Sequence, residues 1–514
     1  MTSNGPIHAL SKKVLLVILD GFGLSPNRFK NAVFDAKKPN IDFLFSNFPT
    51  TTIEPGGESV GLPKGVSGNS EVGHMNLGAG RPVRQDLVRI NEAISNRTLE
   101  SMPELKNLIK YALTHTRRIH LMGLLSDGGV HSHIDHIKTL IAILAQHKDL
   151  EIFFHALMDG RDTASDSGGK YIKELLQQPG FTFASMQGRS IGMDRDRRWE
   201  KIKLSYDTII GQGNIQNVSS LDYLNHQYGH KIYDEFINPV LFDQDYALRD
   251  GDAFFFINFR PDRAIELTLC LTWDKFNEFP TPVRPGHYLC MTPYVPDEVK
   301  LPILFDKEKI QGCMSEYLAS LNKKQFKIAE TEKYAHITYF FNGGRKEPYA
   351  GEQQVLIPSP REVATYDLKP EMSALPVTDR LVAALDSNQH DFYMVNYANA
   401  DMVGHTGNYP AAVQAIEFID QCVQRLIKSC SQSNITMIVT ADHGNADQMA
   451  YPDGKPHTSH TGAKVPFCIF NPKLKGPVSL KTKQDAALMD VSPTILEIMG
   501  EPRPQIFEGQ PIFS

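Results

Sequence analysis

Residues 392–405 read FYMVNYANADMVGH, six largely apolar residues followed closely by a polar segment that contains Asp401 and His405. A run of this length without alternation is typical of a strand buried on both faces, as in a parallel sheet. Acidic side chains just past such a strand lie at the carboxyl edge of an α/β sheet, where ligands and catalytic groups gather. The stretch therefore predicts a parallel α/β fold with a functional site at this edge.

The same arrangement recurs elsewhere: the run 435–440 precedes Asp442 and His443, and the run 14–19 precedes Asp20. A lone Asp at a strand end is as often a helix cap as a ligand, but repetition favours metal ligands. Two divalent ions side by side would stabilise the attacking and leaving oxygens of a phosphoryl transfer. Mixed carboxylate and imidazole ligands favour Mn²⁺ or Zn²⁺ over Mg²⁺. With the HTSH motif at 457–460, the expected ligands are Asp401, His405 and His460 for one ion and Asp20, Asp442 and His443 for the other.

A glycine-bounded segment, GVSGNSEVGH at 65–74, carries two serines. Its spacing differs from the GxSxG turn of α/β hydrolases, so no Ser-His-Asp triad follows from it. A serine bound to a metal would lose its proton at neutral pH and become a nucleophile. The ordinary alternative is a turn with capping serines, and the segment alone does not decide between them.

The segment HSHIDH at 131–136 matches HxHxDH, the dinuclear-metal motif of metallo-β-lactamase-like hydrolases. That interpretation would leave the carboxyl-terminal motifs and the arginines without a role. We therefore expect a loop in which one imidazole contacts substrate and the others are structural.

Arginines are concentrated after predicted strands in the middle of the chain. Surface arginines are common and acidic neighbours neutralise many of them, but a guanidinium also binds phosphate or carboxylate through two parallel hydrogen bonds. Several that converge on one pocket would recognise a small, multiply anionic substrate. The candidates are Arg161, Arg189, Arg195, Arg260 and Arg263.

At 514 residues the chain exceeds a single hydrophobic core, and strand-like runs alternate with helical stretches nearly throughout. The metal-type motifs lie near both ends, and the arginine-rich stretch lies between them. We therefore predict an α/β protein of two domains, with a parallel-sheet, metal-binding domain at 1–84 and 305–514 and an inserted α/β domain at 85–304. The strand ends of the two domains that carry the candidate ligands and the arginines would face one cleft. Strands in the inserted domain are expected at 118–121, 152–157 and 254–257.

The overall charge is ordinary, since 53 basic and 59 acidic side chains give a net charge of −6. It argues against nucleic acid as the main partner. Six scattered cysteines without a CxxC pair fit a reducing cytoplasm. The run 14–19 is too short for a signal or a membrane span, and the polar first thirteen residues are expected to form a loose tail. We expect a soluble, cytoplasmic monomer that contacts no membrane.

Seven motifs, in order along the chain, closely resemble the 2,3-bisphosphoglycerate-independent phosphoglycerate mutase family of the alkaline phosphatase superfamily. They are GNSEVGH at 68–74, DGGVHSH at 127–133, DGRD at 159–162, MDRD at 193–196, NFRPDR at 258–263, ETEKY at 330–334 and DMVGH at 401–405. The resemblance runs from residue 14 to residue 513. It implies an alkaline-phosphatase-like domain split by a transferase domain.

The resemblance also implies an isomerase of glycolysis and gluconeogenesis that interconverts 3-phosphoglycerate and 2-phosphoglycerate through a phosphoserine. The cofactors would be two divalent ions, Mn²⁺ first among them, and no 2,3-bisphosphoglycerate. Ser70 would accept the phosphoryl group and share a metal with Asp20, Asp442 and His443. Asp162 would move protons on the substrate hydroxyls. The substrate pocket would contain His131, Arg161, Asp162, Arg189, Arg195, Arg260, Arg263 and Lys333, the last of which would also offset phosphoryl charge.

One departure from the family pattern concerns Ser67, which stands where methionine is common and adds a hydroxyl three residues before Ser70. Two other functions stay open. One is a superfamily relative such as a phosphopentomutase or a phosphodiesterase. A substrate profile would distinguish it from a phosphoglycerate mutase, and the many arginines disfavour it because they suit a carboxylated substrate. The other is a polyanion-binding protein with structural metals. Such a protein would bind nucleic acid with a steep dependence on salt concentration. The net negative charge of the chain disfavours it.

Overall fold

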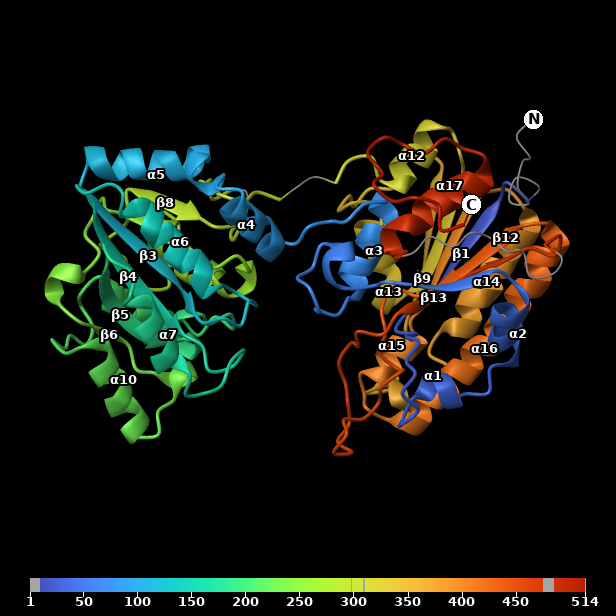
Figure 1. The fold of residues 1–514 in the computed structure, drawn as a ribbon, viewed down its shortest axis with the longest axis horizontal. Helices are drawn as coiled ribbons and strands as arrows, with labels where there is room; N and C mark the ends of the chain where they lie inside the picture. The colour runs from blue at the N-terminus through green and yellow to red at the C-terminus, as the bar shows by residue number, and fades with distance from the viewer. Residues whose placement is uncertain (1–9, 297, 308–309, 475–484, 514) are drawn as a thin grey trace. The chain divides into compact units, whose positions relative to one another are not determined.

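The computed structural model describes residues 10–296, 298–307, 310–474 and 485–513. The chain divides into two compact units: unit 1 contains residues 1–84 and 309–514, and unit 2 contains residues 85–308 (Figure 1). Unit 2 is thus one continuous segment inserted into unit 1.

The core of unit 1 is a sheet of seven strands drawn from both ends of the described chain. The order is β10 (Glu352–Ile357), β9 (Gln325–Glu330), β11 (Phe392–Tyr397), β1 (Val14–Leu19), β12 (Thr436–Thr440), β13 (Val465–Phe470) and β2 (Thr50–Ile53). Neighbours from β10 to β12 are parallel, whereas β13 runs antiparallel to both β12 and β2. The predicted α/β class is confirmed, with an antiparallel edge that the sequence patterns did not predict.

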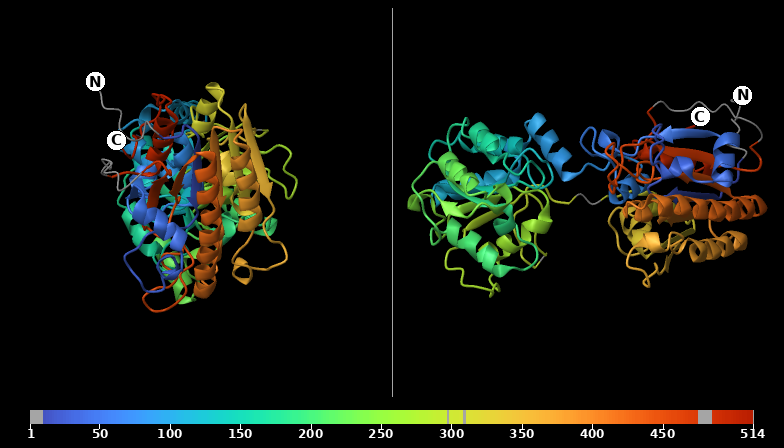
Figure 2. Two further views of the ribbon diagram at one scale, coloured as in Figure 1. Left: turned by 90° about the vertical axis from the view of Figure 1, so that its right-hand side faces the viewer. Right: turned by 90° about the horizontal axis from the view of Figure 1, so that it is seen from below.

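The central strands β1, β11 and β12 are buried along their whole length. Their largely apolar sequences follow from helices on both faces of the sheet (Figure 2). On one face α14 and α2 pack against α16, and on the other α12 and α17 pack against α3. The helices of unit 1 are α1 (Ala32–Asp35), α2 (Pro39–Asn47), α3 (Ser70–Ala79), α12 (Met314–Ser320), α13 (Thr331–Ala335), α14 (Ala374–Ser387), α15 (Asn399–Gly404), α16 (Tyr409–Ser433) and α17 (Val491–Met499).

The prediction that the first thirteen residues form a loose tail is wrong for its last residues, from Leu10 onward. Leu10 is 7% exposed and belongs to the apolar core of unit 1. The hydroxyl of Thr436 donates a hydrogen bond to the Ser11 carbonyl at 3.2 Å. One leucine and one backbone carbonyl fix a segment whose composition is otherwise polar. Residues 1–9 lie outside the described part of the chain.

Unit 2 has its own sheet, of six strands within the described residues: β6 (Val240–Leu241), β5 (Thr182–Gly188), β4 (Glu151–Met158), β3 (Arg118–Leu125), β7 (Ala253–Phe256) and β8 (His287–Cys290). All neighbours are parallel except β5 and β6. Its helices are α4 (Asp86–Ser95), α5 (Pro103–Thr114), α6 (Ile134–Leu144), α7 (Gly168–Leu175), α8 (Arg189–Gly192), α9 (Trp199–Ile209), α10 (Ser220–Gly229) and α11 (Ile265–Thr272).

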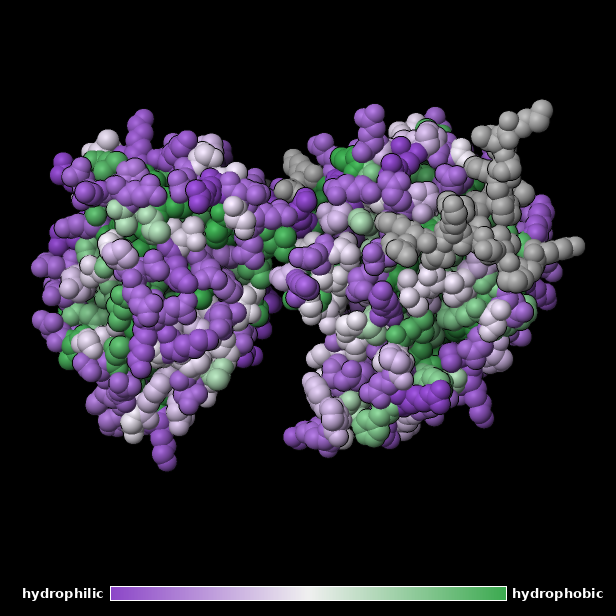
Figure 3. All heavy atoms as spheres, viewed as in Figure 1, coloured by the Kyte–Doolittle hydropathy of each residue, from purple (hydrophilic) through white to green (hydrophobic). Residues whose placement is uncertain are grey.

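The visible surface of each unit is mainly hydrophilic, with apolar side chains scattered over it (Figure 3). In the described part of the chain, no helix combines the length and the apolar character needed to cross a membrane.

Candidate metal centre and arginine cluster

Three buried carboxylates lie at the carboxyl edge of the unit 1 sheet, one after each of its central strands. Asp20 follows β1, Asp401 lies in α15 after β11, and Asp442 follows β12. The two loops after β1 and β11 approach closely because residue 21 is a glycine. Its φ is +76°, and a Cβ atom there would lie 2.7 Å from the Asp401 backbone.

Ser70 begins α3 next to these carboxylates. The side chain of Asn69 caps the helix by accepting a hydrogen bond from Val72 N–H at 3.0 Å. Ser70 Oγ lies 3.3 Å from Asp20 Oδ1 and 2.9 Å from His443 Nε2. It also accepts a hydrogen bond from Lys333 Nζ at 2.8 Å. The hydroxyl therefore contacts a carboxylate, an imidazole and an ammonium at a helix N-terminus, a position that favours anions.

The carboxylates and imidazoles form three groups, each with ligand atoms within 4.8 Å of one another. In the first group, His405 Nε2 and His460 Nε2 lie 3.1 and 3.4 Å from Asp401 Oδ1. The other two groups share Asp20. The groups are Asp401, His405 and His460; Asp20, Asp401 and His443; and Asp20, His74 and Asp442.

The charges of this site fit divalent cations. Lys333 is the cation that contacts Asp20 and Asp401, at 2.8 and 2.6 Å. One ammonium thus faces three buried carboxylates, and burial together with Asp442 raises the pKa of Asp20. Asp442 Oδ2 is buried and accepts no hydrogen bond from the described residues, and its contact with His74 Nδ1 at 3.3 Å is electrostatic. A buried, uncompensated carboxylate is unfavourable without a partner, so this donor set has both the negative charge and a free oxygen for metal ions.

His74 and Asn396 were missed as site residues by the sequence reasoning. His74 Nδ1 lies 2.8 Å from the Ser70 carbonyl and 3.3 Å from Asp442 Oδ2. Asn396 Nδ2 donates to Asp20 Oδ2 at 2.8 Å and lies 3.0 Å from His74 Nε2. His74 closes the GNSEVGH motif one helical turn after Ser70, and Asn396 is a polar residue in a buried strand. Both signals were present in the sequence.

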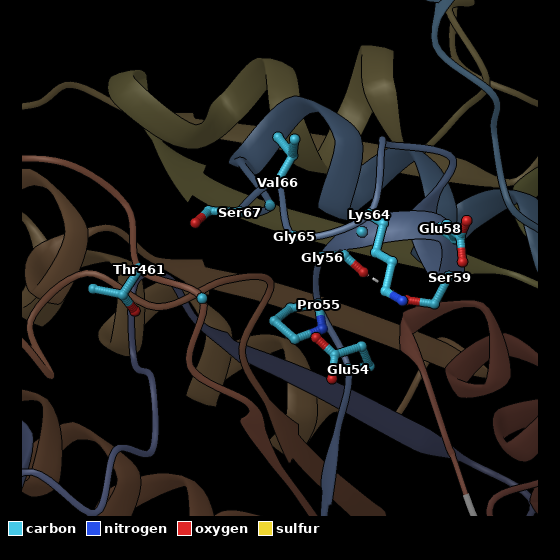
Figure 4. Close-up of a pocket in the computed structure, with 13 residues that line it drawn as sticks. Glu54, Pro55, Gly56, Glu58, Ser59, Lys64, Gly65, Val66, Ser67 and Thr461 are labelled. Carbon is cyan, nitrogen blue, oxygen red and sulfur yellow. Dashed lines mark hydrogen bonds between the residues drawn. The ribbon is translucent and has the colours of Figure 1, made fainter. Parts of the chain in front are cut away.

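Ser67 and Ser70 have different surroundings. Ser67 lines a separate cavity of about 310 Å³, formed mainly by residues 54–59 and 64–68 (Figure 4). His457 also lies apart from the metal-type groups of the described residues, with its ring 4.8 Å from that of Tyr451. Of the HTSH motif, only His460 joins the carboxylates.

The arginines of unit 2 gather around acidic side chains. Arg189 Nη1 bridges Asp159 and Asp162, at 2.7 and 2.6 Å. Asp262 accepts contacts from Arg195 at 2.9 Å and Arg260 at 3.1 Å. These contacts hold the guanidinium groups in place at the ends of β4, β5 and β7.

The remaining pocket candidates of unit 2 belong to the same cluster. Arg263 donates to the Met193 carbonyl at 3.0 Å, and burial and the charges of Arg195, Arg189 and Arg161 lower the pKa of Arg263. Burial and Arg189 lower the pKa of His131 to about 4, so its imidazole is neutral near pH 7. Lys333, in contrast, belongs to unit 1.

The HSHIDH segment does not form a dinuclear-metal site in the described residues. His133 caps α6 by accepting from Asp135 N–H at 3.2 Å, and His136 Nε2 lies 2.7 Å from Asn91 Oδ1. None of the metal-type groups includes a histidine of this segment. Two of the three imidazoles are structural.

Carboxylate and imidazole groups that could hold metal ions lie at the edge of this α/β sheet, as expected of a metalloenzyme, and the model of the Metalloenzyme superfamily matches residues 12–502. The 2,3-bisphosphoglycerate-independent phosphoglycerate mutase of Bacteroides thetaiotaomicron is 44% identical over 506 residues, which cover 98% of this chain and 99% of that protein. That of Myxococcus xanthus is 43% identical, covering 96% and 97%. A solved structure of Leishmania mexicana phosphoglycerate mutase, at low cobalt concentration, has 31% identity and a TM-score of 0.66, covering 99% and 98%. The chain belongs to the 2,3-bisphosphoglycerate-independent phosphoglycerate mutase family.

Proposed function

We propose that this chain is an isomerase that interconverts 3-phosphoglycerate and 2-phosphoglycerate, with divalent metal and without added 2,3-bisphosphoglycerate. The observation that carries the proposal is the position of Ser70 Oγ, within hydrogen-bonding distance of His443 and Lys333 and 3.3 Å from Asp20. Family membership supports the reaction class. In a cell the reaction belongs to glycolysis and gluconeogenesis.

Seven side chains would hold two divalent ions, and their mixed carboxylate and imidazole character favours Mn²⁺. When bound, the ions would supply positive charge that favours deprotonation of a serine hydroxyl and stabilises phosphoryl oxygens. We assign Asp401, His405 and His460 to one ion and Asp20, Ser70, Asp442 and His443 to the other.

The chain's own residues would carry out a double transfer. Ser70 Oγ would bond to phosphorus as the glycerate oxygen leaves, and the phosphoserine would then return the phosphoryl group to the other hydroxyl. Lys333, 2.8 Å from Ser70 Oγ, would offset charge on the phosphoryl oxygens. Between the two transfers, glycerate must be retained and must reorient.

We assign glycerate binding to the arginine cluster of unit 2. The guanidinium groups of Arg260 and Arg263 suit a carboxylate, since a planar guanidinium binds it with two parallel hydrogen bonds. His131, Arg161, Arg189 and Arg195 would complete the pocket. Asp162, held by Arg189 at 2.6 Å, is the candidate for proton transfer at the substrate hydroxyls.

The test is a turnover assay on 3-phosphoglycerate, with product identified by ³¹P NMR. Chelation should abolish turnover, and Mn²⁺ should restore it best among divalent ions. Full activity in a verified metal-free sample, or an absolute need for 2,3-bisphosphoglycerate, would contradict the proposal. We further propose a monomer in the cytoplasm, which light scattering and cell fractionation would check.

A further inference from the structure

A pocket on unit 2 shares Arg195 with the proposed glycerate site, but most of its lining residues have no role in the proposed reaction. It has a volume of about 430 Å³, within the range of about 300 to 1,000 Å³ usual for small-molecule sites. We call it the tryptophan pocket, because Trp199 and Trp273, the two tryptophans of the chain, both line it. Trp199 begins α9, and Trp273 follows α11 directly.

The wall of the tryptophan pocket combines aromatic and aliphatic side chains with charged ones, and it is partly exposed. Phe276 joins the two indoles, with its ring 5.4 Å from that of Trp199 in an edge-to-face arrangement. Ile265 and Leu269 of α11 contribute aliphatic surface. Aromatic faces carry partial negative charge, so a wall of this kind attracts apolar groups and organic cations.

Glu266 supplies a buried carboxylate to the same pocket. The residue is 5% exposed, and its Oε1 accepts a hydrogen bond from Arg197 N–H at 2.8 Å. Its other oxygen, Oε2, is buried and has no hydrogen-bond partner among the described residues. A buried carboxylate oxygen without a donor is unfavourable, so this atom would be stabilised by a ligand that brings an N–H group to it.

The charges around Glu266 favour a positive ligand. Burial and the carboxylates of Asp194 and Asp196 raise the pKa of Glu266, and the Arg197 charge opposes them more weakly. The guanidinium groups of Arg195 and Arg198 have acidic partners, whereas that of Arg197, which lines the pocket, forms no ion pair among the described residues. Arg195 contacts Asp262 at 2.9 Å, and Arg198 contacts Asp194 at 2.5 Å.

We propose that the tryptophan pocket binds a small organic ammonium. The ammonium would donate to Glu266 Oε2, and the apolar part of the ligand would contact Trp199, Trp273 and Phe276. This ligand is opposite in charge to a phosphoglycerate. Because Arg195 and Asp262 also line the pocket, the ligand would lie beside an arginine assigned to the substrate. The site is therefore placed to affect substrate binding from outside the reaction.

The first experiment compares three probes of similar shape on the full-length protein: benzylammonium, benzyl alcohol and benzoate. The readout is tryptophan emission, which is sensitive to this pocket because both tryptophans line it. Benzylammonium should give a saturable change in emission. Its affinity should be at least about tenfold higher than that of benzoate, and the affinity of benzyl alcohol should lie between the two. No saturable change, or binding of benzoate as tight as that of benzylammonium, overturns the proposal.

The second experiment uses two variants with the same change of charge. Glu278 lines the same pocket but is exposed. Glu266→Gln should weaken benzylammonium binding by at least about tenfold, whereas Glu278→Gln should change it by less than about twofold, because an exposed charge is screened. Equal losses would mean a diffuse charge effect and would overturn the assignment of Glu266. Melting temperatures verify that both variants fold. If one of them does not, the comparison of the three probes on the unaltered protein still tests the proposal.

Discussion

Ser70 and Ser67 are three residues apart, yet only Ser70 faces the carboxylates. We expect Ser70→Ala to lose mutase and phosphatase activity together, by on the order of a thousandfold or more, because it removes the nucleophile. Ser67→Ala is the matched control and should retain most activity, since its side chain lines the separate cavity of Figure 4. Rates on 3-phosphoglycerate and mass spectrometry of trapped phosphate check both expectations. Phosphate found on Ser67, or normal turnover by Ser70→Ala, would refute the assignment.

His74 contacts one candidate metal ligand, Asp442, at 3.3 Å and reaches a second, Asp20, through a hydrogen bond with Asn396. Its ring lies between Asp442 and Asn396, and Asn396 donates to Asp20. Groups that orient metal ligands typically contribute about 10- to 100-fold to metal affinity. His74→Ala should therefore weaken Mn²⁺ binding by about that factor, measured by calorimetry. His457→Ala, which removes an imidazole outside the metal-type groups, should leave the affinity unchanged, and equal losses would exclude a specific role for His74.

Asp234, in the 3₁₀ turn Asp234–Phe236, makes the stability of unit 2 depend on pH. It accepts hydrogen bonds from Gly168 N–H at 2.8 Å and from the Tyr228 hydroxyl, but burial raises its pKa to about 6. The folded state therefore holds a proton that the unfolded chain releases near pH 4. The stability linked to this group is complete below about pH 4 and is lost as the pH rises to about 6, by up to about 3 kcal/mol.

Asp234→Asn should remove this pH dependence, because the amide stays neutral and can still accept from Gly168 N–H. The measurement is urea unfolding of variant and parent between about pH 4 and 6, followed by tryptophan emission. Asp245→Asn serves as the control, since that side chain is 86% exposed. A stability difference between Asp234→Asn and the parent that does not change with pH would contradict the expectation.

At the scale of elements, the loop after β1 depends on Gly21. Gly21 and Gly65 both have positive φ, +76° and +80°, but only a Cβ at Gly21 would meet another backbone. An L-residue in this conformation costs about 1 to 2 kcal/mol. Gly65→Ala should lose about that much stability, whereas Gly21→Ala should lose more and should also weaken metal binding by displacing Asp401. Urea unfolding and metal titration measure the two effects, and equal losses of stability would show that the contact with Asp401 is unimportant.

Strand positions in the sheets were largely predictable from sequence. Runs of largely apolar residues predicted β1 and β11 residue for residue, because strands covered on both faces leave few polar positions. In unit 2 the run at 118–121 predicted only the first half of β3, which continues through Gly123 to Leu125. The antiparallel pairing of β13 and β2 was not predictable, since pairing between distant segments leaves no local pattern.

The candidate site was predictable where each residue follows a strand. Asp20, Asp401 and Asp442 were found in this way, and the structure brings them together. Asn396 was missed because it lies within an otherwise apolar run, and the run as a whole was assigned to a strand without a role for its one amide side chain. The surroundings of Ser67 and His457 could not be read from short motifs, because contacts with distant loops decide which side chains reach the carboxylates.

At the scale of the whole molecule, two units divide the proposed chemistry. Arg263→Ala should weaken binding of 3-phosphoglycerate and raise the share of turnovers that end in free phosphate. Loss of such a charged contact costs about 2 to 5 kcal/mol, so the mutase rate should fall at least about tenfold. Phosphatase activity on an aryl phosphate should survive, because it needs only unit 1.

The control is Arg249→Ala, which removes an arginine that is 56% exposed and paired with Asp245. Both activities of this variant should stay near those of the parent. If Arg263→Ala loses both activities in parallel, with its fold and metal content intact, the arginine takes part in the phosphoryl transfer itself and the division between the units is wrong.

The insertion of unit 2 sets an order for folding during synthesis. β1 (residues 14–19) is made long before its partners β11 and β12, which begin at residues 392 and 436. At about 5 to 20 residues per second, the ribosome needs roughly 20 to 80 s to reach β12. Unit 2 is continuous in sequence and is complete long before that. The apolar strand β1 must therefore stay unpaired while unit 2 is made and folds. It is a segment that a nascent-chain chaperone would need to shield.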